Sequence, residues 1–434
     1  MDKKPTILWF VNRVFTEKDL KNQLYGNAKG WLVTLANQLK QDFKLVIVGV
    51  DPNALDFEGA ELSTYHLRPK YWKWKFIRNK VIPVIDFDGD LRLQMQEIIL
   101  REKPDIIHIH GTERPFISIQ KNAAQLGIPV MVSIQGFMSA ILNKYSGGYT
   151  VGFIKRFWFF KAFQKPGYRL LPQTLSANRK QIARQARLEQ VVLPHINYFD
   201  GRTDWDRSIC RLFNPNATYF QIDRILKPPF YNSKWILNDE NNKLIVFTTT
   251  GAAIFKGFDL IAETIHLLQL RGIDLEWRIA GLNKHSGAVR AAQRKLGTRY
   301  PEAKIMLLGP LNAEQLVAEM LQSSLYATAS FIENSPNNLA EAMLLGLPCI
   351  ATLAGGTASY IKHETNGLLV QEGEPWAMAG AILRLWSDRS FAKMLGENAA
   401  ITALARHQPE HVFSQVGAAY QQILSTSDKE INEN

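Results

Sequence analysis

Short apolar runs rich in β-branched residues alternate along the chain with longer segments whose apolar residues recur at helical spacing. In the first half this pattern predicts strands at residues 6–11, 44–50, 105–110 and 129–134, with helices at 30–40 and 90–103. In the second half it predicts strands at 243–249, 275–280, 304–308, 325–329 and 348–352, with helices at 258–271, 313–322, 337–345 and 375–387. Two more helices, at 391–405 and 410–424, and a frayed tail from residue 425 complete the prediction.

Strands that alternate with crossover helices are typical of parallel sheets, and two such series predict an α/β protein with two Rossmann-like, doubly wound domains. Two prolines at 228–229 and a polar stretch at 238–242 suit a linker. We therefore expect an N-terminal domain at 1–228, a C-terminal domain at 229–405, and a last segment at 406–434 that packs back towards the first domain. Ligands are expected in an interdomain cleft, at the carboxyl ends of both sheets.

The amino-acid composition indicates the cellular compartment in which the chain works. Of 434 residues, 46% are apolar and 21% charged, and no stretch approaches the roughly 20 continuous apolar residues of a membrane-spanning helix. The chain has 2 cysteines, Cys210 and Cys349, which is too few for a disulfide framework and favours a reducing compartment. The prediction is a cytoplasmic protein.

The positive charge is concentrated in the first half. Residues 1–228 hold 34 Lys and Arg against 20 Asp and Glu, whereas residues 229–434 hold 17 against 20. Two segments, 65–80 and 153–169, interleave cations with aromatic residues, and residues 114–188 contain no carboxylate. Such segments suit an anionic membrane surface, and this partner is preferred to single-stranded nucleic acid. A plain basic surface over a buried aromatic core stays open as an alternative.

The second half contains a strand, a polar turn and a helix that together suit anion binding. The strand at 325–329 is followed by a turn and by a helix whose start is expected at Ser335 as cap and Pro336 as first residue. The backbone N–H groups of Asn337, Asn338 and Leu339 would then be free to bind phosphate or sugar hydroxyls. No Gly-x-Gly-x-x-Gly follows the first strand of either half, which argues against a nicotinamide or flavin enzyme.

The same region carries a family resemblance. Glu333 and Glu341, separated by seven residues and followed by Ala342-Met343-x-x-Gly346-x-Pro348, resemble the signature of the retaining glycosyltransferases of family 4. Further matches occur in the expected order, at 256–259, 280–281, 308–310, 355–357 and 366–370. The run 201–206, with Phe230-Tyr231, resembles the subset that builds bacterial surface polysaccharides. The resemblance implies the GT-B fold, a nucleotide-sugar donor, and neither metal nor cofactor.

The resemblance also implies roles for individual residues. Lys256 would bind the diphosphate that leaves, which needs cations and N–H groups where negative charge grows. Glu341 would bind the ribose of the nucleotide, and Glu333 would lie beside the donor sugar. The amides of Gly30, Gly355 and Gly356 would assist Lys256.

The sequence departs from the family pattern at two places. Gly251-Ala252 stands where the family has Gly-Arg, so a second phosphate-binding cation is missing from its usual position. Gln135-Gly136 stands where the family has His-Gly, and Gln135 can only form hydrogen bonds. His110 is the nearest substitute on the acceptor side.

Three other groups have more ordinary interpretations. His108 and His110 share one face of a strand and suggest a metal pair, but no third ligand is evident. For His110, a buried, hydrogen-bonded core residue stays open as the alternative to a site residue. The carboxylates at 86, 88 and 90, and those of Asp204 and Asp206, are interpreted as helix caps and solvated loops rather than metal ligands.

The hypothesis from sequence is a retaining glycosyltransferase that transfers a sugar to a glycan or lipid-linked acceptor, peripheral on the inner face of the plasma membrane. Two rivals stay open: a nucleotide-sugar epimerase or isomerase of the same architecture, and a membrane-docked scaffold without activity. The sequence identifies neither the sugar, the acceptor nor the oligomeric state.

Overall fold

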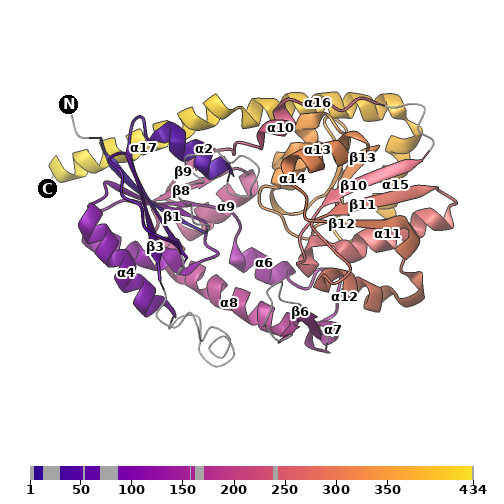
Figure 1. Cartoon of the computed structure of the whole chain (residues 1–434), viewed down its shortest axis with the longest axis horizontal. Helices are drawn as coiled ribbons and strands as arrows, with labels where there is room; N and C mark the ends of the chain where they lie inside the picture. The colour runs from indigo at the N-terminus through magenta and orange to yellow at the C-terminus, as the bar shows by residue number, and fades with distance from the viewer. Residues whose placement is uncertain are drawn as a thin grey trace. The chain divides into compact units, whose positions relative to one another are not determined.

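The computed structural model describes residues 4–12, 30–51, 54–68, 87–156, 158–161, 171–237 and 243–432. The chain forms two compact units (Figure 1). Unit 1 comprises Met1–Ser139, Gln181–Ile225 and Gln408–Asn434, and unit 2 comprises Ala140–Lys180 and Leu226–His407. Each unit contains a parallel sheet with helices against it, as the alternating pattern predicted.

Unit 1 is built on a seven-stranded sheet in the order β3-β2-β1-β4-β5-β8-β9. The strands are β1 (Thr6–Val11), β2 (Lys44–Val50), β3 (Leu62–Leu67), β4 (Ile106–His110), β5 (Val130–Ser133), β8 (Tyr198–Gly201) and β9 (Thr218–Gln221). Its helices are α2 (Gly30–Leu39), α4 (Phe87–Glu102), α5 (Gln120–Gln125), α9 (Asp204–Phe213) and α17 (Pro409–Asn432). Every strand pair is parallel, and the strand order reverses between β1 and β4.

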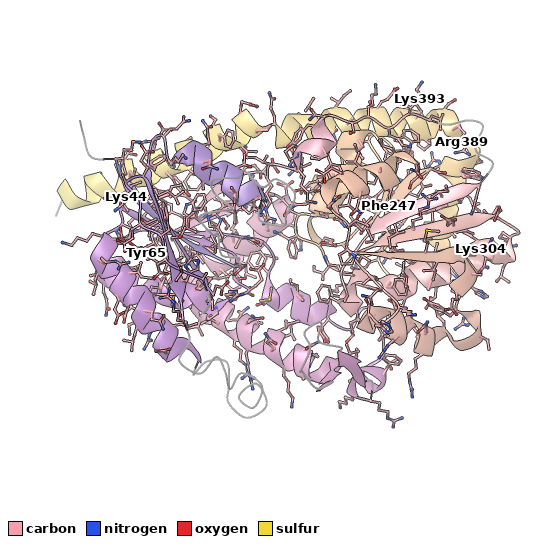
Figure 2. The ribbon with its side chains drawn as sticks, in the orientation of Figure 1. Lys44, Tyr65, Phe247, Lys304, Arg389 and Lys393 are labelled. Carbon is pink, nitrogen blue, oxygen red and sulfur yellow. The ribbon has the colours of Figure 1, made fainter. Side chains whose placement is uncertain are left out.

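Helix α17, from the far end of the sequence, completes the core of unit 1. All six residues of β1 are buried, as expected for a central parallel strand covered on both faces. Tyr420 of α17 is fully buried, packs edge-on against Phe43, and accepts a hydrogen bond from Trp9 Nε1 at 2.8 Å. At the outer strands, Lys44 and Tyr65 both bond the carboxylate of Glu102 on α4 (Figure 2).

Unit 2 is built on a six-stranded parallel sheet in the order β12-β11-β10-β13-β14-β15. The strands are β10 (Leu244–Thr249), β11 (Leu275–Ala280), β12 (Ile305–Gly309), β13 (Leu325–Thr328), β14 (Cys349–Thr352) and β15 (Leu368–Val370). The helices are α7 (Val151–Arg156), α10 (Pro228–Tyr231), α11 (Phe258–Leu270), α12 (Gly287–Leu296), α13 (Ala313–Leu321), α14 (Asn337–Leu345), α15 (Pro375–Ser387) and α16 (Arg389–His407). The strand order reverses between β10 and β13, and Phe247 of β10 is fully buried (Figure 2).

The units are joined through more than one crossing of the chain. Helices α6 (Met138–Lys144) and α8 (Leu175–Val192) each contain a boundary between units, and β6 (Trp158–Lys161) pairs antiparallel with β7 (Leu171–Thr174) inside the inserted segment. Residues 140–180 therefore cluster with unit 2, whereas the sequence placed them in the first domain. Residues 408–434 cluster with unit 1. The expected linker at 238–242 lies outside the described residues.

The strands expected from the pattern are all present, with ends shifted by no more than one residue, but β3, β6, β7, β8, β9 and β15 were missed. The frayed tail was a wrong prediction, because α17 continues to Asn432. The hydroxyls of Ser425 and Thr426 both bond the carbonyl oxygen of Gln422, which lets these polar residues continue a helix. No helix in the described part of the chain is long and apolar enough to cross a membrane.

Candidate functional site

Lys256 and Glu333 meet at the carboxyl end of the sheet of unit 2. Lys256 ends a 3-10 turn that follows β10, and Glu333 lies in the loop between β13 and α14. Lys256 Nζ lies 2.7 Å from Glu333 Oε1, which also accepts a hydrogen bond from Ser330 Oγ at 2.7 Å. β10 and β13 are the strands between which the order reverses, the position where ligands bind in open parallel sheets.

A glycine allows these two loops to approach each other. Gly257 has a φ of +73°, and a Cβ atom on it would lie 1.9 Å from the carbonyl oxygen of Ala329. A hydrogen bond also joins the two loops next to this contact: the Phe331 N–H donates to the Phe255 carbonyl oxygen at 2.8 Å. Because only glycine fits this backbone and this space, Gly257 fixes the distance between the lysine loop and the glutamate loop.

The start of α14 differs from the sequence prediction. The cap is Pro336, which has extended backbone and makes no side-chain capping bond, so the prediction of Ser335 as cap was wrong. Leu339 N–H already donates to the Pro336 carbonyl oxygen at 3.1 Å and is not available to a ligand. The N–H groups of Asn337 and Asn338 have no acceptor among the described residues. The helix becomes regular only at Asn337, one residue later than expected, which leaves Ser335 too far from the helix to cap it.

Three buried side-chain oxygens at this end of the sheet have no partner in the described chain: Thr249 Oγ1, Thr250 Oγ1 and Asn337 Oδ1. Asn338 Nδ2 donates to the Thr249 carbonyl oxygen at 2.6 Å, so the end of β10 touches the start of α14. Buried polar atoms are nearly always hydrogen-bonded, and a group of unpartnered ones marks a place where a polar ligand can supply the partner.

Glu341 is almost fully buried within α14 and pairs with a lysine that sequence reasoning missed. Lys227 Nζ lies 2.8 Å from Glu341 Oε1. Burial raises the pKa of Glu341, and the charge of Lys227 opposes this only in part. A carboxylate in the apolar helix Asn337–Leu345 requires a cation, and this requirement was the available signal for Lys227.

The Gly355-Gly356 turn holds the backbone of Glu333. Gly356 N–H donates to the Glu333 carbonyl oxygen at 3.0 Å, and a Cβ on Gly355 would lie 2.1 Å from the same oxygen. The Gly356 amide is therefore already used, and the prediction that it faces the donor was wrong. The turn instead positions the loop that carries Glu333.

The remaining candidates lie in unit 1. Gly30 is the first residue of α2, and Gln135 follows β5 and is half-buried. His110 is buried at the end of β4, and burial, together with nearby positive charge, lowers its pKa well below the ordinary value. The structure therefore gathers Lys256, Glu333 and the start of α14 in unit 2.

Asp206 and His108 both have structural partners inside unit 1. Asp206 forms a capping box with Thr203 at the start of α9, and no group of metal-ligating residues occurs in the described ranges. His108 bonds Ser133, Asp200 and Tyr420 inside unit 1. Asp86, the first carboxylate of the 86–90 run, and most of the segments at 65–80 and 153–169 lie outside the described residues.

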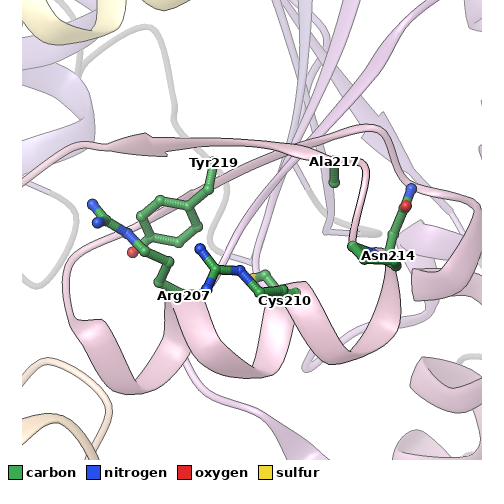
Figure 3. Close-up of a pocket in the computed structure, with 7 residues that line it drawn as sticks. Arg207, Cys210, Asn214, Ala217 and Tyr219 are labelled. Carbon is green, nitrogen blue, oxygen red and sulfur yellow. The ribbon is translucent and has the colours of Figure 1, made fainter.

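A cavity of about 330 Å³ lies beside α9 and β9 in unit 1 (Figure 3). Arg207, Cys210 and Arg211 line it from the helix, with Tyr219 on the strand side. None of the predicted site residues lines this cavity.

Comparison with known proteins agrees with the geometry of unit 2. Residues 232–402 match the family described as "Glycosyl transferases group 1". These matched residues indicate a glycosyltransferase. N-acetyl-alpha-D-glucosaminyl L-malate synthase of Bacillus anthracis is 31% identical over 28% of this chain and 32% of its own. The amylovoran biosynthesis glycosyltransferase AmsK of Erwinia amylovora is 26% identical over 40% of this chain and 42% of its own. The matched stretches thus span a third to two fifths of these relatives.

Solved structures support the fold over the whole chain. Sucrose-phosphate synthase from Thermosynechococcus elongatus has a TM-score of 0.70 at 13% identity, covering 98% of this chain and all of that one. Anabaena HepE in complex with UDP and glucose has a TM-score of 0.64 at 13% identity, covering 96% of this chain and 100% of that one. The GT-B fold expected from the sequence is confirmed, whereas the interdomain cleft stays a prediction.

Proposed function

We propose that the protein transfers a sugar, with retention of configuration, from a nucleoside diphosphate sugar to a glycan or lipid-linked acceptor in bacterial surface polysaccharide synthesis. The Lys256–Glu333 pair carries the proposal, because it places a cation and a carboxylate together at the switch point of the unit 2 sheet. AmsK, named for amylovoran biosynthesis, and HepE, solved with UDP and glucose, support the polysaccharide and nucleotide-sugar parts.

In this proposal the donor diphosphate replaces Glu333 as the partner of Lys256. The side chain of Lys256 is 29% exposed and that of Glu333 is 10% exposed, so the ammonium can turn towards solvent-borne phosphate while the carboxylate stays in place. The N–H groups of Asn337 and Asn338 add donors at a helix start, where anions bind well. As the bond to the sugar breaks, these groups stabilise the charge that grows on the leaving diphosphate.

We assign the nucleoside of the donor to helix α14 and to the end of strand β10. Glu341, held by Lys227, offers a carboxylate oxygen to the ribose hydroxyls, and Thr249 and Thr250 offer unpartnered hydroxyls. Glu333, released from Lys256, then faces the donor sugar. No metal is needed, since lysine and helix amides supply the positive charge.

A donor screen tests the assignment directly. UDP-, GDP- and TDP-sugars are added to the purified chain, and the melting temperature is followed at increasing nucleotide concentration. We expect the donor with one of the three bases to raise the melting temperature of the wild type, and to raise that of Lys256→Ala less. Lys304→Ala is the control, because Lys304 directly precedes β12, is similarly exposed and pairs with Asp274. Equal shifts in all three proteins would overturn the placement of the diphosphate.

Transfer itself is tested with labelled donor and a membrane fraction as acceptor. A labelled glycan or lipid supports the transferase, whereas a changed donor sugar without any acceptor would instead establish the epimerase alternative. No binding and no product would favour the scaffold.

The membrane part of the proposal rests on composition. The segment 153–169 has five cations interleaved with aromatic residues. Sedimentation with vesicles containing phosphatidylserine should retain the protein, and neutral phosphatidylcholine vesicles should not. Replacing the five cations with glutamine should abolish the difference, and persistence of binding in that variant would contradict a membrane role for this segment.

A further inference from the structure

One tyrosine hydroxyl joins the two ends of the longer segment of unit 2. Unit 2 comprises residues 140–180 and Leu226–His407, so this longer segment enters at Leu226 and leaves at His407. The Leu226 N–H donates to Tyr231 Oη at 2.9 Å, and the same hydroxyl donates its hydrogen to the His407 carbonyl oxygen at 2.5 Å. Because a hydroxyl accepts and donates at once, Tyr231 ties both ends together with one group.

The entry segment, Leu226–Tyr231, has a defined seat on unit 2. Lys227 is the cap of α10, and Pro228 and Pro229 at the start of this helix preset its backbone. Phe230 is fully buried, and α10 packs against α13 and α14 (Figure 1). The position of Lys227 is therefore set by the packing of α10.

The entry segment reaches one carboxylate of the candidate site. Lys227 Nζ lies 2.8 Å from Glu341 Oε1, and Glu341 is almost fully buried. The Tyr326 hydroxyl is a neighbour of Glu341 on β13, and burial raises its pKa well above the usual value, so it adds no charge. Lys227 thus supplies the positive charge that Glu341 needs, and it does so only while the entry segment is seated.

The exit of the segment reaches the other carboxylate. The Arg406 guanidinium donates to the Ser359 carbonyl oxygen and lies over the Tyr360 ring, 4.1 Å from its centroid. Ser359 ends the 3-10 turn that contains Gly356, and the Gly356 N–H donates to the Glu333 carbonyl oxygen at 3.0 Å. The exit therefore braces the turn that positions Glu333.

We propose that Tyr231 is a positioning residue that couples the donor site to both ends of this segment. While its hydroxyl joins entry to exit, Lys227 is held on Glu341 and the Gly356 turn is braced behind Glu333. Coupling between two sites is reciprocal, so a bound nucleotide must in turn strengthen the bonds of Tyr231. The proposal rests on the proposed function, because it takes the nucleotide to bind at Glu341 with its sugar beside Glu333.

Hydrogen exchange tests the coupling at Tyr231 itself. The Leu226 amide exchanges when its bond to Tyr231 opens, so a peptide that contains Leu226 reports this opening by mass spectrometry. UDP, GDP and TDP are tried as probes, and the one that gives the largest melting shift is used. We expect this nucleotide to slow the exchange of that peptide in wild type and to have no such effect in Tyr231→Phe. Equal exchange with and without nucleotide in wild type would overturn the coupling.

Nucleotide affinity tests the same coupling from the other side. Tyr231→Phe should weaken binding of the probe about fivefold, the lower end of couplings between sites. Tyr300→Phe is the matched control and should bind as wild type does, because Tyr300 is also half-buried in unit 2 but lies in the loop between α12 and β12. A role in packing alone would lower the melting temperature equally with and without nucleotide. Lys227→Met should lose affinity, whereas Lys227→Arg, which keeps a cation on Glu341, should retain it.

Two negative results have different meanings. No melting shift in wild type with UDP, GDP or TDP would overturn the proposed function, and the coupling with it. Binding of equal strength in wild type and Tyr231→Phe would overturn the coupling alone and leave the proposed function standing.

Discussion

Lys256 and Glu333 form an ion pair at 2.7 Å although 77 positions separate them in the sequence. Each lies in the loop after one of the two strands between which the order reverses, and Gly257 lets the loops touch at Ala329. A cation and a carboxylate are thus held together where the sheet opens to ligands. This pairing makes both charges available to one substrate.

Loss of either charge should impair transfer without unfolding the protein. Lys256→Ala and Glu333→Gln are each expected to lower kcat by about 10² or more, the usual effect of removing one group that stabilises transition-state charge. Glu276→Gln is the matched control, since Glu276 is also ion-paired and 17% exposed but lies at the start of β11, at the opposite end of the sheet. Transfer rates with saturating donor decide the matter, and wild-type turnover in Lys256→Ala would contradict its role.

Gly257 offers a test of the loop contact itself. Gly257→Ala should destabilise unit 2 by more than Gly272→Ala, because both glycines have a φ of +73° but only Gly257 faces a backbone atom. The control should cost about 1 kcal/mol for the left-handed backbone alone. Unfolding in urea measures the difference, and equal losses would mean that the loops do not need this close approach.

Some of this site could be predicted from sequence and some could not. Glu333, Glu341 and Lys256 stand in a fixed order that the resemblance captured, and the strands beside them were found because buried parallel strands are continuously apolar. Lys227 was missed because its partnership with Glu341 depends on the fold, not on spacing along the chain. The cap of α14 was misplaced by one residue, since serine before proline is the favoured helix start, whereas here Pro336 itself takes the cap position without a side-chain hydrogen bond.

Contacts that depend on the fold also explain why parts of unit 1 were not predicted. The short strands β8 and β9 lack the apolar run of β1, and β9 has no fully buried residue, so periodicity gave no signal for it. His108 and Tyr420 lie 312 positions apart, and no local pattern predicts their hydrogen bond.

The acid stability of unit 1 should depend on Asp200. Its pKa in the folded state lies below the ordinary value of 3.8, so the carboxylate stabilises the fold above that pH and the contribution is lost as the pH falls through the folded pKa. Asp200→Asn should remove this part of the pH dependence and lower the free energy of unfolding at pH 7. Urea unfolding between pH 2 and pH 7 tests it, and an unchanged acid limb in the variant would contradict the assignment.

The Lys227–Glu341 pair of unit 2 allows a pH dependence of stability with the opposite sign to be tested. Lys227→Met leaves a buried carboxylate without its cation, which should cost about 3 kcal/mol at pH 7. The folded pKa of Glu341 is already raised above 4.5 by burial and should rise further in this variant. Stability of Lys227→Met relative to wild type should therefore be greatest below the unfolded pKa and fall as the pH rises through the folded one. The double variant Lys227→Met with Glu341→Gln serves as control, because it removes the titrating group and should lose the pH dependence. Urea unfolding from pH 4 to pH 8 decides between them, and parallel curves for the single and double variants would show that the lysine does not hold a buried charge.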